Sequence, residues 1–393
     1  MARRILGIAA IALAALGLSG CWNQAGWNWG HTNDNVSESV LGASNISGVT
    51  QKWYNSSLTY VANSSVANSL VYVADGFTPS IESLSETTGL VSGFHAETGL
   101  PTTPAIGNTI SGGNGKVFTT ETGTEAVLQA FDPNLNLLWS RTLPGKTPSA
   151  VTLAPNGPNP TGNGNAGLLV VTMLDTHVVV AYSETGTLLG QTPTGLYSTP
   201  AAVGSGLAYV GRTDGELDAL TLPTLGFDWT APVVIGPSKG MVASPSQAGS
   251  AVYAATKDGI VAAVDSTTGT VQWRNTTLTG AVNDTMAVHN SLLYVTENQA
   301  AASPIYALNT ATGLVSWHHE DVTTGANASG PIIANGVVYY YTGANGIVDA
   351  IDAASGTLVA PVTTKDTLAG FSPVVSDGQL FITGSPGLQD LAP

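Results

Sequence analysis

Few residues of this sequence have types and spacings that could do metal chemistry. The nearest approach to a metal motif is the run His318-His319-Glu320. On a strand, neighbouring side chains point to opposite faces, so the two imidazoles could reach one ion only across a bulge. His318 and Glu320 could share a face, but we favour a solvated strand end after Trp317. We therefore predict no metal ligand and no catalytic residue.

A short acidic triplet is the second candidate site. Asp214, Glu216 and Asp218 alternate along one expected strand and would therefore lie on the same face. Such a face could bind a cation or a partner protein. A solvated sheet edge is the alternative, because it has the same pattern.

Two long loops offer further places for contact. Residues 154–167 are rich in Pro, Gly and Asn and contain Asn163 and Asn165, and residues 297–304 form the second loop. Binding residues concentrate on loops that a rigid scaffold positions. We name Asn163 and Asn165, together with the acidic triplet, as candidate interaction residues; a tolerated insertion is the alternative.

The N-terminus has the pattern of a secretory signal. Arg3 and Arg4 precede an apolar stretch, residues 5–18, that is too short to span a membrane comfortably. It ends in Leu18-Ser19-Gly20-Cys21, which resembles a bacterial lipobox. The resemblance implies cleavage after residue 20 and lipidation of Cys21, the only cysteine of the chain. An ordinary secretory signal is the alternative.

The composition excludes several classes of partner. Only 9% of the 393 residues are charged, and 11 basic against 26 acidic residues give a formal charge of -15. Nucleic-acid binding needs clustered Lys and Arg, and so does attraction to an anionic membrane. We therefore predict no nucleic-acid partner, and a membrane contact made through the lipid anchor alone. The hydrophobic share of 43% is enough for a large core.

A repeat of about 43 residues organises the chain after residue 48 and must position every candidate above. The glycines Gly269, Gly313 and Gly356 are spaced by 44 and 43 residues, and tryptophans recur with the same period. Each unit contains about four short strands rich in β-branched and aromatic residues, separated by turn dipeptides such as Asp258-Gly259. This is the strand content of one propeller blade.

The motif within each unit resembles the pyrroloquinoline-quinone-type (PQQ) propeller repeat. One copy runs from Ala263-Val264-Asp265 through Thr268-Gly269 to Trp273. The resemblance implies that Asp265 caps a tight turn, that Gly269 takes a left-handed conformation and that Trp273 docks between neighbouring blades. Residues 21–47, with Trp22, Trp27 and Trp29, resemble the lead-in that packs on such rings; a tryptophan-rich ligand site is the alternative.

Counting the units predicts the architecture. Seven units are complete, and the eighth, residues 372–393, lacks its tryptophan strand, which residues 49–53 could supply. We predict an all-β fold: an eight-bladed β-propeller of four-stranded antiparallel blades over residues 48–393, with the last blade closed by the N-terminal strand. Closure would remove exposed sheet edges. A seven-bladed ring with residues 372–393 as a tail is the alternative.

Two functional classes remain open. Proteins with this repeat include quinoprotein dehydrogenases, but a tricarboxylate cofactor would need convergent cations. The nine basic residues that follow the signal are scattered over the units, so we predict no cofactor. The lipobox, the length and the ring together resemble the lipoproteins of the outer-membrane barrel-assembly machinery, which are scaffolds. A PQQ-dependent dehydrogenase-like redox protein or cofactor carrier is the alternative.

The resemblance implies a monomeric, non-catalytic ring that binds envelope proteins. The barrel-assembly machinery is one specific partner that it suggests. The residue after Cys21 is Trp22 rather than Asp. In a Gram-negative cell this favours the outer membrane, on its periplasmic or surface face. In a bacterium with one membrane, we expect the protein on the outer face of that membrane.

Overall fold

A computed structural model describes most of the chain after the predicted signal. The described residues are 22–59, 61, 63–108, 112–155, 167–236, 240–241, 243–283, 285–298, 304–320, 328–342, 346–365, 371–385 and 387–393. Cys21, Asn163 and Asn165 lie outside them. No helix in these ranges is long and apolar enough to cross a membrane.

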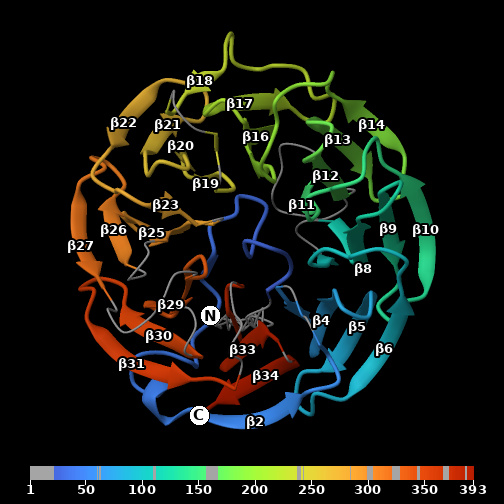
Figure 1. Cartoon of the computed structure of the whole chain (residues 1–393), viewed down its shortest axis with the longest axis vertical. Helices are drawn as coiled ribbons and strands as arrows, with labels where there is room; N and C mark the ends of the chain where they lie inside the picture. The colour runs from blue at the N-terminus through green and yellow to red at the C-terminus, as the bar shows by residue number, and fades with distance from the viewer. Residues whose placement is uncertain are drawn as a thin grey trace, which may run out of the picture.

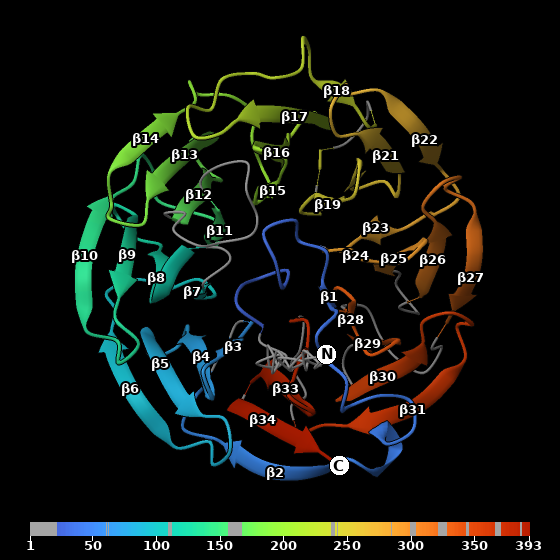
Figure 2. The ribbon, with the colours of Figure 1, turned by 180° about the vertical axis from the view of Figure 1, so that it is seen from behind.

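Eight antiparallel sheets are arranged in a closed ring (Figures 1 and 2). The first four blades consist of β3 (Ser65–Ala67), β4 (Leu70–Asp75), β5 (Ser80–Ser85) and β6 (Val91–Ala96); β7 (Ala105–Asn108), β8 (Gly112–Glu121), β9 (Val127–Phe131) and β10 (Leu137–Thr142); β11 (Thr152–Pro155), β12 (Gly167–Met173), β13 (Val178–Ser183) and β14 (Leu188–Gln191); and β15 (Ala202–Gly204), β16 (Leu207–Gly211), β17 (Glu216–Thr221) and β18 (Val233–Val234).

The other four blades repeat this order from the axis outward. They consist of β19 (Ser246–Ala248), β20 (Ala251–Ala255), β21 (Val261–Asp265) and β22 (Val271–Asn275); β23 (Ala281–Val282) and β24 (Ala287–His289), which both pair with β25 (Leu292–Asn298), then β26 (Ile305–Asn309) and β27 (Val315–His319); β28 (Ile332–Ala334), β29 (Val337–Tyr341), β30 (Ile347–Asp352) and β31 (Leu358–Thr363); and β32 (Val374–Ser376), β33 (Gln379–Gly384), β34 (Gly387–Ala392) and β2 (Thr50–Asn55).

The two ends of the chain meet in blade 8. Strand β2 pairs antiparallel with β34, and Trp53 lies opposite Asp390. The N-terminal strand therefore completes the last blade, which confirms the predicted eight-bladed ring; the seven-bladed alternative is wrong. Two short elements precede β2 in the chain. Strand β1 (Asp34–Asn35) pairs parallel with β28 at the inner edge of blade 7, and the 3-10 helix η1 (Ile46–Gly48) lies just before β2.

The repeated turn and tryptophan hold each blade to the next. Asp265 accepts hydrogen bonds from the backbone N–H groups of Thr267 and Thr268, and Gly269 has a φ of +72°. A Cβ on Gly269 would lie 3.0 Å from the indole of Trp229, which belongs to the preceding blade. Only glycine fits both the left-handed conformation and the close approach. The same contact joins Trp53 to Gly89, Trp139 to Gly186, Trp273 to Gly313 and Trp317 to Gly356, which confirms the predicted docking.

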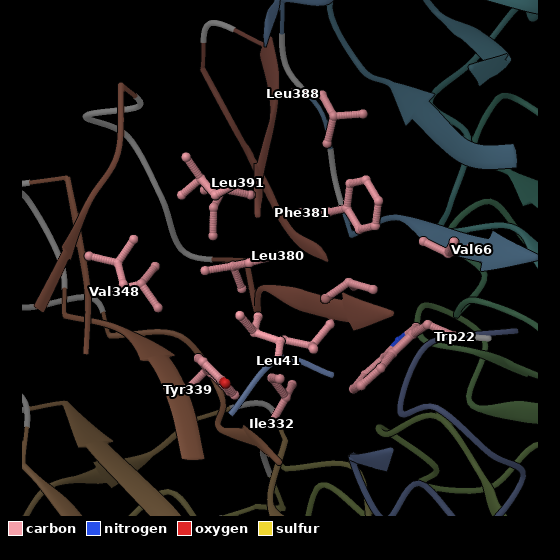
Figure 3. Close-up of a cluster of buried hydrophobic side chains, with 14 of the residues drawn as sticks. Trp22, Leu41, Val66, Ile332, Tyr339, Val348, Leu380, Phe381, Leu388 and Leu391 are labelled. Carbon is pink, nitrogen blue, oxygen red and sulfur yellow. The ribbon is translucent and has the colours of Figure 1, made fainter. Parts of the chain in front are cut away.

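The hydrophobic core lies between the blades, because each sheet packs its apolar side chains against its neighbours. The largest cluster surrounds the place where the chain ends meet (Figure 3). There Trp22 and Leu41 of the lead-in are buried with Tyr339 of blade 7 and Phe381 of blade 8. The lead-in is therefore part of the core of the ring.

Candidate functional site

The ring has two faces, which the strand directions define. Face A carries the turns between the first and second strands of each blade, such as 205–206, and those between the third and fourth. Face B carries the turns between the second and third strands, such as 212–215, and the connections between blades. Each innermost strand therefore runs from face B to face A.

The lead-in occupies the centre of the ring, where the early residues of the chain are seen in Figures 1 and 2. It hydrogen-bonds to the middle of the innermost strand, or to its second residue, in all eight blades. The contacts join Trp22 to Val66 (two bonds, 2.7 and 2.8 Å), Asn23 to Ile106, Gln24 to Leu153, Trp29 to Val203, Gly30 to Gln247, Thr32 to Val288, Asn33 to Ile333 and Asn35 to Val375.

This arrangement satisfies the inner edges of the blades. The first strand of a blade has a neighbour on one side only, so its other backbone groups point toward the axis and need partners. The lead-in supplies an acceptor to one N–H group in each of seven blades, and in blade 8 Asn35 donates to the carbonyl of Val375. The central space of the ring is thus taken up by the protein's own chain.

Side chains of the lead-in reinforce these contacts. His31 is buried and bridges two blades, with Nδ1 2.6 Å from the Ser244 hydroxyl and Nε2 3.1 Å from the Thr152 hydroxyl. Burial lowers the pKa of His31 to about 4, so the imidazole is neutral at physiological pH. Trp27 and Trp29 pack against the apolar clusters of the blades. The tryptophan-rich segment therefore serves the packing of the ring.

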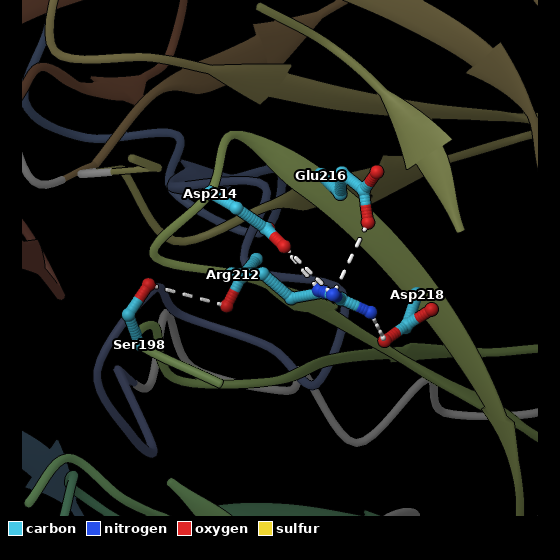
Figure 4. A network of polar contacts seen from close by, with 6 residues as sticks. Ser198, Arg212, Asp214, Glu216 and Asp218 are labelled. Atoms are coloured by element: carbon cyan, nitrogen blue, oxygen red, sulfur yellow. Dashed lines mark hydrogen bonds and ion pairs between the residues drawn. The ribbon is translucent and has the colours of Figure 1, made fainter. Parts of the chain in front are cut away.

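The structure brings the acidic triplet together around an arginine that the sequence analysis did not single out (Figure 4). Arg212 lies 2.7 Å from Asp214, 3.2 Å from Glu216 and 3.3 Å from Asp218. Asp214 lies in the turn before β17, whereas Glu216 and Asp218 lie on the strand. Burial raises the pKa of Asp218, and the charge of Arg212 opposes this effect.

Arg212 departs from its equivalents in other blades. It stands three residues after Tyr209, as Asp75 and Glu121 stand three residues after Tyr72 and Phe118. Those two carboxylates accept backbone N–H bonds from the incoming connection between blades, at 2.9 Å from Thr59 to Asp75 and 2.8 Å from Thr98 to Glu121. A comparison of the repeats at this position could have identified Arg212 from the sequence.

An exposed apolar residue lies beside this cluster on face B. Leu196 is exposed, and its carbonyl accepts a hydrogen bond of 2.8 Å from the N–H of Thr213. We call Leu196, Arg212, Asp214 and Glu216 the face-B patch. It combines one apolar side chain with a fixed group of charges, which suits contact with a protein.

His318 and His319 contact different residues on opposite sides of β27. His318 stacks on Tyr306 with ring centroids 5.8 Å apart, and Nε2 of His319 lies 3.8 Å from Asp349. In the part of the chain that the structure describes, no group of three or more His, Cys, Asp or Glu residues is arranged to hold a metal ion.

Several basic side chains in the described ranges each bond to a different part of the ring. Arg141 donates to the carbonyl of Gly186, Arg274 to that of Ile235 and Lys52 to that of Pro393. Together with Arg212, these cations lie on different blades and do not converge on one place. These four cations therefore do not form the kind of cluster that a tricarboxylate needs.

Comparisons with known proteins point to one family. Residues 67–317 and 175–391 match the family model described as outer membrane protein assembly factor BamB. The protein of that name from Yersinia pestis is 30% identical over 158 residues, which are 36% of this chain and 38% of that protein. This aligned region thus spans well under two thirds of the relative's length.

Solved structures share the fold at low sequence identity. BamB from Moraxella catarrhalis has a TM-score of 0.65 and 16% identity, and the match covers 87% of this chain and 97% of that one. Quinohemoprotein alcohol dehydrogenase from Comamonas testosteroni has a TM-score of 0.69 and 12% identity, over 95% of this chain and 80% of that one. These likenesses concern the fold alone, whereas the family model covers most of the sequence. This chain belongs to the family of the outer membrane protein assembly factor BamB.

Proposed function

We propose that this protein is a lipid-anchored, non-catalytic scaffold of the cell envelope, which binds envelope proteins on one face of its ring. Components of outer-membrane protein assembly are the partners that its family indicates. Cys21 carries the anchor in this proposal, and the face-B patch is the contact surface.

One observation carries the proposal: the lead-in fills the centre of the ring. A small-molecule site needs a concave space, and the axial channel is the main one that a propeller offers. Here residues 22–35 occupy that space and hydrogen-bond to all eight blades. To admit a quinone on the axis, the ring would have to give up these bonds. Its outer surfaces stay available for proteins.

The electrostatics of the face-B patch favour a polar protein contact. Three carboxylates surround one guanidinium, so the cluster keeps an excess of two negative charges when all four groups are ionised. Such fixed charges give specificity and speed association with a partner that carries Lys or Arg. Leu196 would add apolar contact area.

Co-purification tests the proposal. The full chain, tagged at its C-terminus, is solubilised with its native membranes in mild detergent, and bound proteins are identified by mass spectrometry. We expect a barrel-assembly protein in stoichiometric yield. We expect Leu196→Glu to reduce this yield at least tenfold, and Leu138→Glu, on the exposed outer strand β10, to leave it unchanged.

The redox alternative has its own test. Purified protein is titrated with pyrroloquinoline quinone and calcium while absorbance and dye reduction are followed. We expect neither stoichiometric quinone uptake nor dye reduction. A coloured, calcium-dependent complex that reduces dye, or recovery of cytochromes in place of assembly proteins, would overturn the scaffold proposal.

A further inference from the structure

We propose that face A rests on the lipid bilayer and that face B, with its patch, points away from it. This inference depends on the lipidation of Cys21 in the proposed function. It adds an orientation and a second interaction surface, whose partner is the phospholipid headgroup layer.

The direction of the backbone at Trp22 is the first observation. Trp22 pairs antiparallel with Val66 through two hydrogen bonds. Strand β3 runs toward face A and ends there in the turn 68–69. Because the pairing is antiparallel, the backbone at Trp22 runs from face A toward face B, so its N-terminal side faces face A.

The distance from the anchor to the ring is the second observation. One peptide bond joins Cys21 to Trp22, and consecutive Cα atoms are about 3.8 Å apart. Trp22 is itself buried in the core cluster of Figure 3. Acyl chains on Cys21 would therefore hold the ring close to the bilayer, with no flexible linker between them.

Exposed apolar side chains lie where the lead-in leaves the ring again. Strand β1 runs parallel to β28, toward face A, and is followed by Val36, which is 68% exposed. Val40 is 58% exposed and lies beside Gly378, in the face-A turn of blade 8. At the rim of the same face, Leu90 and Leu314 follow turn glycines and are also exposed. Such side chains gain free energy at a lipid interface.

The face-A turns nearest the axis carry fewer charges than the turns of face B. Among the six described turns between first and second strands, only one, 377–378, contains a charged residue; the others are 68–69, 205–206, 249–250, 290–291 and 335–336. On face B, the described turns between second and third strands carry Glu125, Asp175, Arg212, Asp214, Lys257 and Asp258. The described face-A turns near the axis therefore approach lipid with little charge to desolvate, Asp377 being the exception.

The rim of face A sets the depth of this contact. The aspartates that cap the turns between third and fourth strands, such as Asp132 and Asp265, lie there, farther from the axis. Their carboxylates stay in water, so we expect the ring to lie at the level of the headgroups and not to insert.

Site-specific fluorescence quenching tests the orientation. Because Cys21 is the only cysteine, and its thiol is blocked when it carries a lipid, an introduced cysteine is the only free thiol. Ser205→Cys and Thr213→Cys place a fluorophore at the two ends of β16, and Ser250→Cys and Lys257→Cys do so for β20. Each strand has five residues and spans about 17 Å, which is enough to separate the labels in height.

Each lipidated variant is reconstituted in vesicles of phosphatidylethanolamine and phosphatidylglycerol that contain a nitroxide headgroup quencher. We expect the labels at residues 205 and 250 to be quenched at least threefold more than those at 213 and 257. Equal quenching, or stronger quenching on face B, in protein that floats with the vesicles would overturn the orientation and leave the anchor in place. Protein that does not float, and whose mass shows no lipid, would overturn the anchor and the orientation together.

Discussion

At the scale of single residues, the contact between a tryptophan and the next blade's turn has two parts, packing and a hydrogen bond. The Trp273 indole packs on Gly313 and donates from Nε1 to the carbonyl of Thr310, at 2.8 Å. Trp229 packs on Gly269 in the same way, but the carbonyl of Ser266 there accepts the hydroxyl of Tyr209, at 3.1 Å. The buried Nε1 of Trp229 has no hydrogen-bond partner among the described residues.

This difference predicts unequal costs for the same substitution. Trp273→Phe removes a hydrogen bond, whereas Trp229→Phe removes a buried donor that makes none. We expect Trp273→Phe to lower the free energy of unfolding by about 1 kcal/mol more than Trp229→Phe. Denaturant unfolding of both variants measures this, and equal losses would contradict the assigned bonding.

At the scale of elements, the lead-in lies in the centre of the ring and contacts every blade. Its backbone lies so close to blade 5 that a Cβ on Gly30 would be 2.6 Å from the carbonyl oxygen of Gln247. At Gly48, just before β2, a Cβ would meet nothing within 4 Å. The two glycines therefore provide a matched pair.

We predict that Gly30→Ala destabilises the protein and Gly48→Ala does not. The added methyl group must push the lead-in away from a backbone atom, which costs about 1–3 kcal/mol. Thermal unfolding measures the difference. If the two variants unfold at the same temperature, the lead-in does not lie as described.

The closure of the ring contains a second feature at this scale, a pair of buried carboxyls. Asp390 lies opposite Trp53 with neither carboxyl oxygen hydrogen-bonded in the described structure, and Glu86 stands in the adjoining turn of blade 1. Burial, with a contribution from Asp377, raises the pKa of Glu86 to about 7. Burial, with the charge of Glu86, raises the pKa of Asp390 to about 7.

These shifts predict that the carboxyl pair contributes stability in mild acid. Both carboxyls bind a proton more tightly in the folded protein than in the unfolded chain, so they stabilise the fold most below about pH 4. This stabilisation is lost as the pH rises through about 7, and the free energy of unfolding changes by on the order of a few kcal/mol. Unfolding free energies measured from pH 4.5 to 8 should fall, and Asp390→Asn should flatten the profile. Asp265→Asn is the control, because the turn bonds lower the pKa of Asp265 and it stays ionised over this range. The lowered pKa of His31 acts in the opposite direction, so the pair is tested by the difference between the wild type and Asp390→Asn. Identical profiles for these two proteins would contradict the burial of the pair.

At the scale of the whole molecule, the sequence predicted what is local and repeated. The turn aspartate, the left-handed glycine and the docking tryptophan recur with one period, so the number of blades could be derived from their spacing. Their contacts were implied by the resemblance to the PQQ-type repeat. The closing strand followed from a blade that lacked one. The course of the lead-in could not be predicted in this way, because its partners, from Val66 to Val375, lie in every blade and share no motif with it.

The candidate site was predictable only in part. The acidic triplet was visible as an alternating pattern, but the convergence of its members on Arg212 depends on how β16 and β17 pair, with Val210 opposite Asp218 and Gly211 opposite Leu217. The low charge of the face-A turns near the axis can be seen only when it is known which turns share a face. The first feature depends on strand pairing within one blade, and the second on the arrangement of the blades in the ring.

The central claim is that this ring, filled by its own chain, works through proteins bound on face B. Photo-crosslinking in living cells tests it most directly, with a photoreactive amino acid placed at Leu196 on face B or at Leu138 on the outer strand. We predict an adduct with a barrel-assembly protein from position 196 and none from position 138. An adduct with an electron-transfer protein, or the same pattern from both positions, would contradict the claim.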